Sequence, residues 1–135
     1  MFKDDLTAGC NDLPVEDRII VSVLTVAAPR GPKLSPDRLD FASKAVLRNM
    51  QDKIRLVYRM AAHNGQDRLV LGAMGCGAYS CPAPAVAREM KNILLEEEFK
   101  GRWKEVVFAV LSKEVDYWGK GNFGVFNAAL KDVKV

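Results

Sequence analysis

The chain has 135 residues, of which 49% are hydrophobic and 27% are charged. This composition excludes extensive disorder, and the length suits one folded domain rather than two. The formal net charge of +3 is scattered along the chain. It is compatible with an anionic ligand, but it does not indicate binding to duplex nucleic acid.

Targeting signals and metal sites are also not indicated. Asp4 and Asp5 stand where a signal peptide would need a cationic start, and no apolar run approaches the length of a membrane span. An odd number of cysteines, three, suits a reducing compartment. Cys76 and Cys81 do not have a zinc-ligand spacing. We therefore expect an intracellular protein, cytoplasmic or nuclear, with no membrane contact, no metal and no cofactor.

The first part of the chain contains one strand pattern between two irregular stretches. Residues 1–18 predict an irregular lead-in, because Gly9 and Pro14 interrupt a charged stretch. Residues 19–26 are almost continuously apolar and β-branched, which is typical of a parallel strand covered on both faces. Residues 27–36 contain three prolines and one glycine, so they predict a loop.

The rest of the chain alternates between helical and strand patterns. The predicted elements are a helix from Ser43 to a stop at Asn64 and Gly65, a strand over 68–72, a helix over 84–98, a strand over 106–111 and a helix over 122–131. The positions expected to face the core are Val46, Leu47, Met50, Ile54, Val57, Tyr58 and Ala61, then Val86, Met90, Ile93 and Leu94, and finally Phe123, Phe126 and Leu130. This order predicts an α/β fold with a parallel sheet, helices on both faces and ligand binding beyond the carboxyl ends of the strands.

The stretch from Gly72 to Pro82 joins a predicted strand directly to a predicted helix. Its glycines leave the backbone open to a ligand, and amides at a helix N-terminus attract anions. The stretch therefore predicts phosphate binding, with a tight turn that holds no ligand as the alternative. Residues 119–124 match the G-x-G-x-x-G pattern of dinucleotide sites, but too little chain follows them, so we interpret them as a turn before the last helix.

Three separated segments resemble one protein family. In macrodomains, which bind ADP-ribose, the second phosphate loop runs Ser-x-Gly-x-Tyr-Gly-x-Pro, and here Gly75 stands at the serine position before Gly77, Tyr79, Ser80 and Pro82. Val-Leu-Thr-Val-Ala-Ala-Pro precedes this loop and Val-Val-Phe-Ala-Val-Leu-Ser follows it. Together the segments are similar to the microbial-type poly(ADP-ribose) glycohydrolase family, in particular to the C-terminal portion of its fungal members.

The resemblance extends from about Phe2 to the C-terminus and carries an expectation about the fold. It implies a three-layer α/β/α macrodomain-like domain with a reduced, mostly parallel sheet flanked by helices. Residues 1–135 would form a single, partial domain of this kind.

The resemblance also implies a ligand site. The amides of residues 75–79 would wrap a diphosphate, Tyr79 would close over the ribose side, and the segment 27–29 would line the adjacent rim. The residues expected to bind the ligand are Gly72, Gly75, Cys76, Gly77, Ala78, Tyr79, Ser80, Ala27, Ala28, Pro29, Asn122, Phe123 and Phe126. The last three would lie on the adenosine side. Tyr117 and Trp118 are candidates for stacking on adenine, with a core position as the alternative.

The expectation for catalysis differs from the expectation for binding. Members of this family carry a Gly-Gly-Gly loop and a Gln-Glu-Glu segment with the catalytic glutamate, and this sequence contains neither. The only acidic run is 96–98, at the end of a predicted helix, where a solvated face is expected. We therefore expect binding of ADP-ribose or an ADP-ribosylated protein, and the catalytic residues are unknown. The alternatives are a glycohydrolase with a non-standard or partner-supplied acid, and an interaction protein without a ligand.

Two further hypotheses concern pairing and cysteine chemistry. The family's sheet has a strand between two of the strands retained here, so its absence predicts a homodimer or pairing with another chain. Cys76 lies in a glycine-rich turn near a predicted helix N-terminus, an environment that lowers a thiol pKa, and His63 is the only histidine available as its base.

Overall fold

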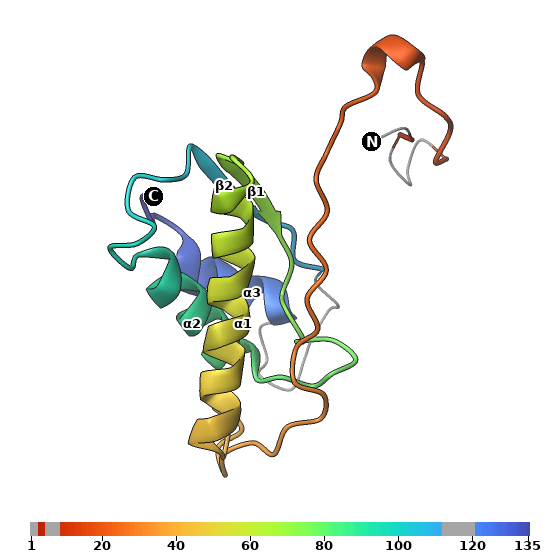
Figure 1. Ribbon diagram of the computed structural model, residues 1–135. Helices are drawn as coiled ribbons and strands as arrows, with labels where there is room; N and C mark the ends of the chain where they lie inside the picture. The colour runs from red at the N-terminus through yellow and green to blue at the C-terminus, as the bar shows by residue number, and fades with distance from the viewer. Residues whose placement is uncertain (1–2, 5–8, 112–120) are drawn as a thin grey trace.

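The computed structural model describes residues 3–4, 9–111 and 121–135, and the following account is limited to them. The elements are a short 3-10 helix η1 (Val15–Asp17), α1 (Lys44–His63), β1 (Arg68–Leu71), α2 (Ala83–Leu94), β2 (Glu105–Phe108) and α3 (Gly121–Leu130). Figure 1 shows α1 crossing in front of the two strands, with α2 and α3 behind it. The predicted α/β class and the alternation of helices and strands after residue 43 are confirmed.

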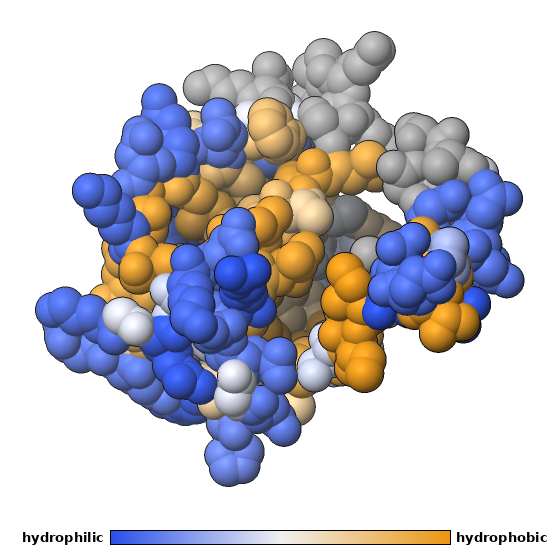
Figure 2. Space-filling view, turned by 90° about the horizontal axis from the view of Figure 1, so that it is seen from above, coloured by the Kyte–Doolittle hydropathy of each residue, from blue (hydrophilic) through white to orange (hydrophobic). Residues whose placement is uncertain are grey.

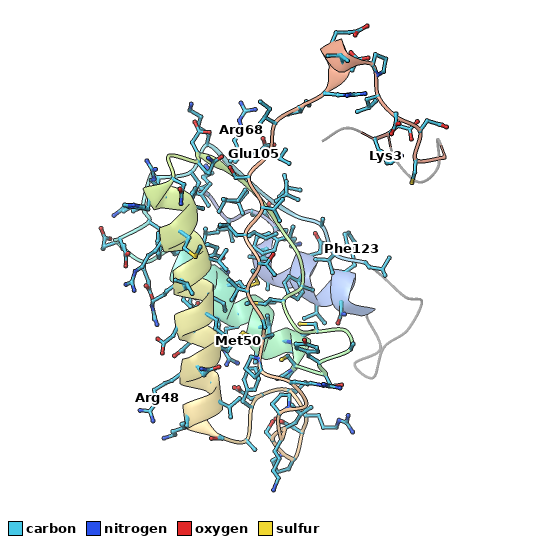
Figure 3. The ribbon with its side chains drawn as sticks, turned by 45° about the vertical axis from the view of Figure 1, so that its right-hand side comes forward. Lys3, Arg48, Met50, Arg68, Glu105 and Phe123 are labelled. Atoms are coloured by element: carbon cyan, nitrogen blue, oxygen red, sulfur yellow. The ribbon has the colours of Figure 1, made fainter. Side chains whose placement is uncertain are left out.

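The sheet formed by the described residues has two parallel strands. Arg68 pairs with Glu105 at one end and Leu71 with Phe108 at the other, and Figure 3 shows Arg68 and Glu105 side by side. Helices flank this small sheet, as predicted. Val70 and Val107 remain 76% and 45% exposed, however, so the sheet is less covered than the prediction of two packed faces required.

The strand predicted over residues 19–26 is wrong. These residues form no strand, and residues 20–26 make no hydrogen bond to the rest of the described chain. The segment runs past β1 as part of an extended N-terminal arm, residues 9–26 (Figure 1). An apolar, β-branched run indicates that the segment favours a pleated, covered surface. A strand also needs a neighbouring strand to accept and donate its hydrogen bonds.

A hollow separates this arm from β1. Leu24 and Val26 line it from the arm, Ile54 and Tyr58 from α1, and residues 70–74 from the end of β1, around a cavity of about 250 Å³. Seen from above in Figure 2, apolar surface borders a hollow between the body of the molecule and the arm. The arm therefore lies near the sheet without joining it.

Helix α1 agrees with its prediction. Its buried residues Met50, Ile54, Tyr58 and Ala61 recur every three or four positions, which is the period of one helical face. The helix ends before Asn64, and Gly65 follows with a φ of +74°, a conformation that glycine adopts without steric cost.

Helix α2 ends at Leu94, four residues before the predicted end at Glu98. The chain turns here and carries two carboxylates back to α1. Arg55 donates to both oxygens of Glu96 at 2.7 to 3.1 Å, and Arg59 donates to Glu98 at 2.6 and 2.8 Å. The acidic run is therefore not simply a solvated helix face: two of its three members join α1 to the end of α2.

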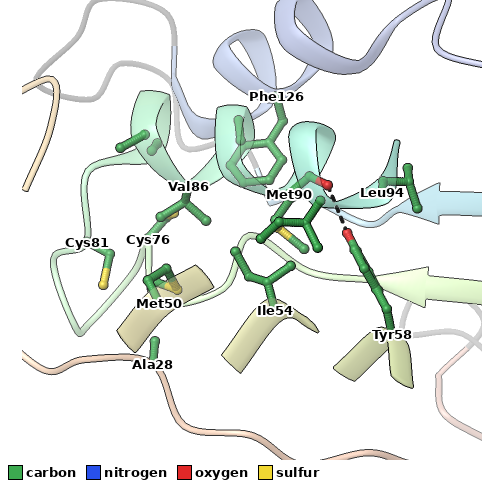
Figure 4. Close-up of a cluster of buried hydrophobic side chains, with 14 of the residues drawn as sticks. Ala28, Met50, Ile54, Tyr58, Cys76, Cys81, Val86, Met90, Leu94 and Phe126 are labelled. Carbon is green, nitrogen blue, oxygen red and sulfur yellow. Dashed lines mark hydrogen bonds between the residues drawn. The ribbon is translucent and has the colours of Figure 1, made fainter. Parts of the chain in front are cut away.

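The core lies between the three helices and the sheet (Figure 4). Tyr58 is fully buried, its ring centroid lies 5.4 Å from that of Phe99, and its hydroxyl donates to the carbonyl of Met90 at 3.2 Å. The side chains predicted to face inward from α2 are all buried. In α3, Phe126 is 2% exposed and contacts Phe108, with ring centroids 6.0 Å apart. The prediction that Phe123 faces inward is wrong, because it is 52% exposed and points away from α2 (Figure 3).

Candidate ligand site

The loop from Gly72 to Pro82 is a sequence of tight turns between β1 and α2. The amide of Cys76 donates to the carbonyl of Ala73 at 3.0 Å, and the amide of Ser80 donates to that of Gly77 at 2.9 Å. The amide of Cys81 then closes the loop on the carbonyl of Gly75 at 3.0 Å. The loop therefore has a defined shape before any ligand binds.

Gly75 is the point where a second segment meets this loop. Its φ is +75°, and a Cβ placed on it would lie 2.6 Å from the Cβ of Ala28 and 2.8 Å from Sγ of Cys81. Both distances are far below van der Waals contact, so only glycine fits. Two hydrogen bonds fix the same contact: the amide of Gly31 donates to the carbonyl of Tyr79 at 2.9 Å, and Sγ of Cys81 donates to the carbonyl of Pro29 at 3.2 Å.

The start of α3 contacts the loop as well. Nδ2 of Asn122 donates to the carbonyl of Cys76 at 3.2 Å. Its Oδ1 is buried and has no hydrogen-bond partner within the described chain. Asn122 is thus the residue of the predicted adenosine-side group that reaches the loop.

The other two members of that group lie elsewhere. Phe126 is part of the core, and Phe123 and Phe126 together line a separate cavity of about 170 Å³ with Phe108, Val110 and Lys131 among its walls. Tyr117 and Trp118 lie outside the described residues. The structure therefore brings two of the three predicted segments to one cavity and attaches the third to it through Asn122.

That cavity has a volume of about 410 Å³. Its walls are Thr25, Val26, Ala27 and Ala28 on one side, and Met74, Gly75, Gly77, Ala78 and Tyr79 on the other. Of the remaining predicted site residues, Gly72 lines the hollow beside β1 and Ser80 lines a different hollow with Ser35 and Arg38. Cys76 is buried behind the loop rather than exposed in it.

The described residues that line the cavity carry no charged side chain, so the attraction that they offer an anion comes from the backbone. The amides of Gly75, Gly77, Ala78 and Tyr79 donate no hydrogen bond within the described part of the chain. The amide of Cys76 is occupied by the turn to Ala73. Helix α2 begins just after the loop, and its N-cap, Pro82, supplies no side-chain cap. Unpaired amides beside a helix N-terminus form a chemically suitable anion site.

The cysteine hypothesis is contradicted by this environment. Burial raises the pKa of the Cys76 thiol to about 12, and burial raises the pKa of the Cys81 thiol to about 11. His63 ends α1, thirteen residues or about 20 Å along the helix from Met50, which packs near Cys76 (Figure 4). A thiol that stays protonated and lies far from the proposed base is not a nucleophile.

Sequence reasoning missed part of the cavity wall. Thr25, Val26 and Met74 line it, but they are ordinary apolar or small residues in sequence and carry no motif. The hydrogen bond from Asn122 to the carbonyl of Cys76 was missed as well, because the two residues lie 46 positions apart in the sequence. The clue available in the sequence was the pair of small residues at 27 and 28, which allows the close approach to Gly75.

Helices that could cross a membrane and clusters of metal-ligating side chains were sought among the described residues. None of the helices there is long and apolar enough to span a membrane. No group of three or more His, Cys, Asp or Glu side chains in the same residues could hold a metal ion.

Comparison with known proteins finds similarity to solved structures of a bacterial enzyme. No protein-family model and no curated protein matches the sequence. Among solved structures, poly(ADP-ribose) glycohydrolase from Deinococcus radiodurans in complex with ADP-ribose is 36% identical, with a TM-score of 0.56, over 64% of this chain. Another crystal form of that complex gives 35% identity and a TM-score of 0.57 over 66% of this chain, and the apo form gives 36% and 0.56 over 64%.

This similarity covers part of the bacterial enzyme. The chain spans about a third of the length of these solved structures, 34% in each of the three. At this level of identity the matched region supports the macrodomain-like α/β fold predicted from the sequence.

Proposed function

We propose that this chain binds ADP-ribose, free or attached to protein, through the cavity between residues 25–28 and the loop 74–79. The observation that carries the proposal is the group of four amides, on Gly75, Gly77, Ala78 and Tyr79, with no partner in the described chain at the wall of a preformed cavity. Similarity to a protein solved with ADP-ribose supports this choice of anion.

The cavity suits a diphosphate attached to sugars. Its volume of about 410 Å³ lies in the range of small-molecule sites, roughly 300 to 1,000 Å³. Its uncharged walls would make each amide hydrogen bond to phosphate strong, because few competing charges or polar side chains surround it. The N-terminus of α2 adds partial positive charge on the same side.

We assign roles to the neighbouring residues on this basis. Residues 75–79 would hold the diphosphate, Tyr79, which is 38% exposed, would close over the ribose side, and residues 27–29 would form the opposite rim. Asn122 would support the loop from behind. Phe123, which is exposed near the start of α3, stays the candidate for the adenosine side, whereas Phe126 is buried in the core. Gly72 and Ser80 would lie at the two ends of the loop.

We further propose that the chain corresponds to the C-terminal portion of a glycohydrolase domain closest to the fungal members of that family. It would act as one partial domain after an irregular lead-in of about eighteen residues, inside the cell. Binding without cleavage is the favoured activity, because the sequence contains no Gly-Gly-Gly loop and no Gln-Glu-Glu segment. Within the acidic run, Glu96 and Glu98 are ion-paired to Arg55 and Arg59, and neither lines the cavity.

Calorimetric titration with ADP-ribose tests the proposal. Gly77→Ala and Gly77→Val add increasing bulk at the cavity wall, and a Cβ at Gly77 would meet nothing within 4 Å in the protein itself. We expect affinity to fall in the order wild type, Ala, Val, by about tenfold or more for valine. Leu56→Ala, on the exposed side of α1, is the matched control and should bind like the wild type.

Two results would overturn this function. Absence of heat with millimolar ligand would exclude ADP-ribose as the ligand, and equal affinity for all four proteins would place binding outside this cavity. The glycohydrolase alternative is tested separately by incubation with an ADP-ribosylated protein. Release of ADP-ribose that disappears on substitution of one carboxylate would establish cleavage, and we expect no release.

A further inference from the structure

A second hollow adjoins the candidate ligand cavity at residues 79 and 80. It has a volume of about 350 Å³. The residues that line it are Pro32, Leu34, Ser35, Arg38 and Ser80. Tyr79 lines the ligand cavity, and Ser80, the next residue, lines this hollow. Because consecutive Cα atoms lie about 3.8 Å apart, the two spaces come within one residue of each other.

The loop of residues 30–42 forms most of this hollow and has a fixed shape. The amide of Ala42 donates to the carbonyl of Lys33 at 2.9 Å and closes the loop. The amide of Gly31 donates to the carbonyl of Tyr79 at 2.9 Å and attaches the loop to the ligand site. The loop then leads directly into α1 (Figure 1). The hollow is therefore present before any ligand binds.

Two polar residues that line the hollow adopt a backbone conformation that favours glycine. The φ of Arg38 is +59°, and the φ of Ser80 is +56°. This conformation costs free energy in a residue with a Cβ, and such costs are concentrated at functional sites. Polar side chains thus occupy two positions where glycine would fit the backbone better.

The loop also presents positive charge at the hollow and beside it. Arg38 lines the hollow, and Lys33 stands between the wall residues Pro32 and Leu34. Lys33 and Arg30 are exposed, and neither forms an ion pair within the described chain. An anion bound here would meet cations on the loop.

The two carboxylates of the same loop hold its shape. Asp40 accepts a hydrogen bond from the guanidinium of Arg88 on α2 at 2.8 Å. Asp37 accepts from the hydroxyl of Ser35 at 2.5 Å and from the amide of Leu39 at 3.0 Å. Both carboxylates are therefore bound to groups that keep the loop folded.

We infer that this hollow binds a carboxylate side chain of the polypeptide that carries ADP-ribose, so that the protein prefers ADP-ribose on an acidic segment to free ADP-ribose. The inference rests on the proposed function. There Tyr79 covers the ribose side of the ligand, and a modified protein is attached to ADP-ribose through that ribose. The polypeptide therefore leaves the cavity beside Ser80 and Arg38.

The donors of the hollow suit a carboxylate better than a second phosphate. The amides of Ser35, Arg38 and Ser80 each donate to a carbonyl of the protein, unlike the open amides of the ligand cavity. The hollow offers side-chain donors instead: the planar guanidinium of Arg38, which matches a carboxylate, and the hydroxyl of Ser80, which makes no hydrogen bond within the described residues. Pro32 and Leu34 supply apolar contact for the methylene groups of a glutamate.

Calorimetry with matched conjugates tests the inference. The probes are free ADP-ribose and two synthetic peptides, each with one ADP-ribosylated serine, which is flanked by glutamates in the first peptide and by glutamines in the second. We expect the wild type to bind the glutamate peptide about five- to tenfold more tightly than the glutamine peptide. Raising the salt from about 0.1 M to about 1 M shortens the Debye length from about 10 Å to about 3 Å and should remove most of this preference.

Charge variants locate the preference. The double variant Lys33→Gln/Arg38→Gln should bind the two peptides with equal affinity and free ADP-ribose like the wild type, because neither residue lines the ligand cavity. Arg38→Lys keeps the charge and should keep most of the preference. Lys134→Gln removes an exposed cation beside the C-terminus, at the far end of α1 from the loop 30–42 (Figure 1). It is the matched control and should behave like the wild type.

The outcomes separate this inference from the proposed function. Equal wild-type affinity for the two peptides, together with binding of free ADP-ribose, would overturn the inference and leave the proposed function intact. A preference that survives the double variant would also overturn it, since the glutamates would then bind elsewhere. A short ADP-ribose polymer that binds more tightly than the glutamate peptide, and loses this advantage in the double variant, would assign the hollow to phosphate and refute the inference. Absence of binding by free ADP-ribose would overturn both.

Discussion

Gly75 and Ala28 approach each other so closely that a single added methyl group would bring two Cβ atoms to 2.6 Å. They lie 47 positions apart in sequence, and both line the candidate cavity. The approach depends on both residues, because glycine also supplies the φ of +75° and alanine leaves room for Cys81 between the segments. The shape of the loop is therefore a consequence of two small residues packed against a buried thiol.

A pair of glycine substitutions tests this contact. Gly75→Ala should lower the free energy of unfolding by about 2 to 5 kcal/mol, since it combines a left-handed backbone with a severe overlap. Gly77→Ala meets nothing within 4 Å and has no such backbone constraint, so it should change stability by about 1 kcal/mol or less. Urea denaturation measures both values. Similar losses for the two variants would show that the loop adopts another conformation.

The elements that sequence predicted well are those whose signal is local. The period of Met50, Ile54 and Tyr58 marked α1, and the glycine at 65 marked its end. The segments 68–71 and 105–108, each with one charged residue followed by three apolar ones, form strands because each provides the hydrogen-bonding partner of the other. The run at 19–26 is also apolar and rich in β-branched residues, but it has no such partner in the described chain. Composition alone does not reveal that difference.

The candidate site was predictable to a similar extent. Its glycines and the small residues at 27 and 28 could be found in the sequence, and the structure places them at one cavity. The position of Phe123 could not be predicted in this way. Phe123, Phe126 and Leu130 all have the apolar character expected of an inward face, but of these three only Phe126 is buried. The burial of Cys76 was also hidden, since it depends on α2 and α1 packing around the loop.

Asn122 should be sensitive to charge as well as to loss of its hydrogen bond. Asn122→Ala removes the donor to the carbonyl of Cys76 and should cost about 1 kcal/mol of stability, with a modest loss of ADP-ribose affinity. Asn122→Asp removes the donor and adds a negative charge behind the phosphate loop, so its affinity should fall further. Calorimetry at two salt concentrations measures this. Affinity of the Asp variant equal to that of the Ala variant at low salt would argue against a phosphate at this loop.

The three cysteines should differ in reactivity. Because burial raises the pKa of Cys76 to about 12 and that of Cys81 to about 11, neither forms much thiolate at pH 8, whereas Cys10 is partly exposed. We expect iodoacetamide to label one position in the native protein and all three in urea, as measured by mass spectrometry. The Cys10→Ser variant should remain unlabelled until it unfolds. Rapid native labelling of Cys76 would restore the cysteine hypothesis.

The ion pair between Arg59 and Glu98 should make stability depend on pH in the acid range. The hydrogen bonds from the Arg59 guanidinium hold the pKa of Glu98 below its usual value of 4.5. A carboxyl whose folded pKa lies below its unfolded pKa binds more protons when unfolded, so its contribution is complete above about pH 4.5 and is lost as the pH falls through the folded value. Urea midpoints between pH 6 and pH 3 should therefore decline less steeply in Glu98→Gln. Arg59→Gln should show the same reduced decline, and the double variant should show no further reduction. A double variant with an additive change would mean that the two residues act separately, in which case another pair, such as Asp67 with Lys104, accounts for the acid dependence.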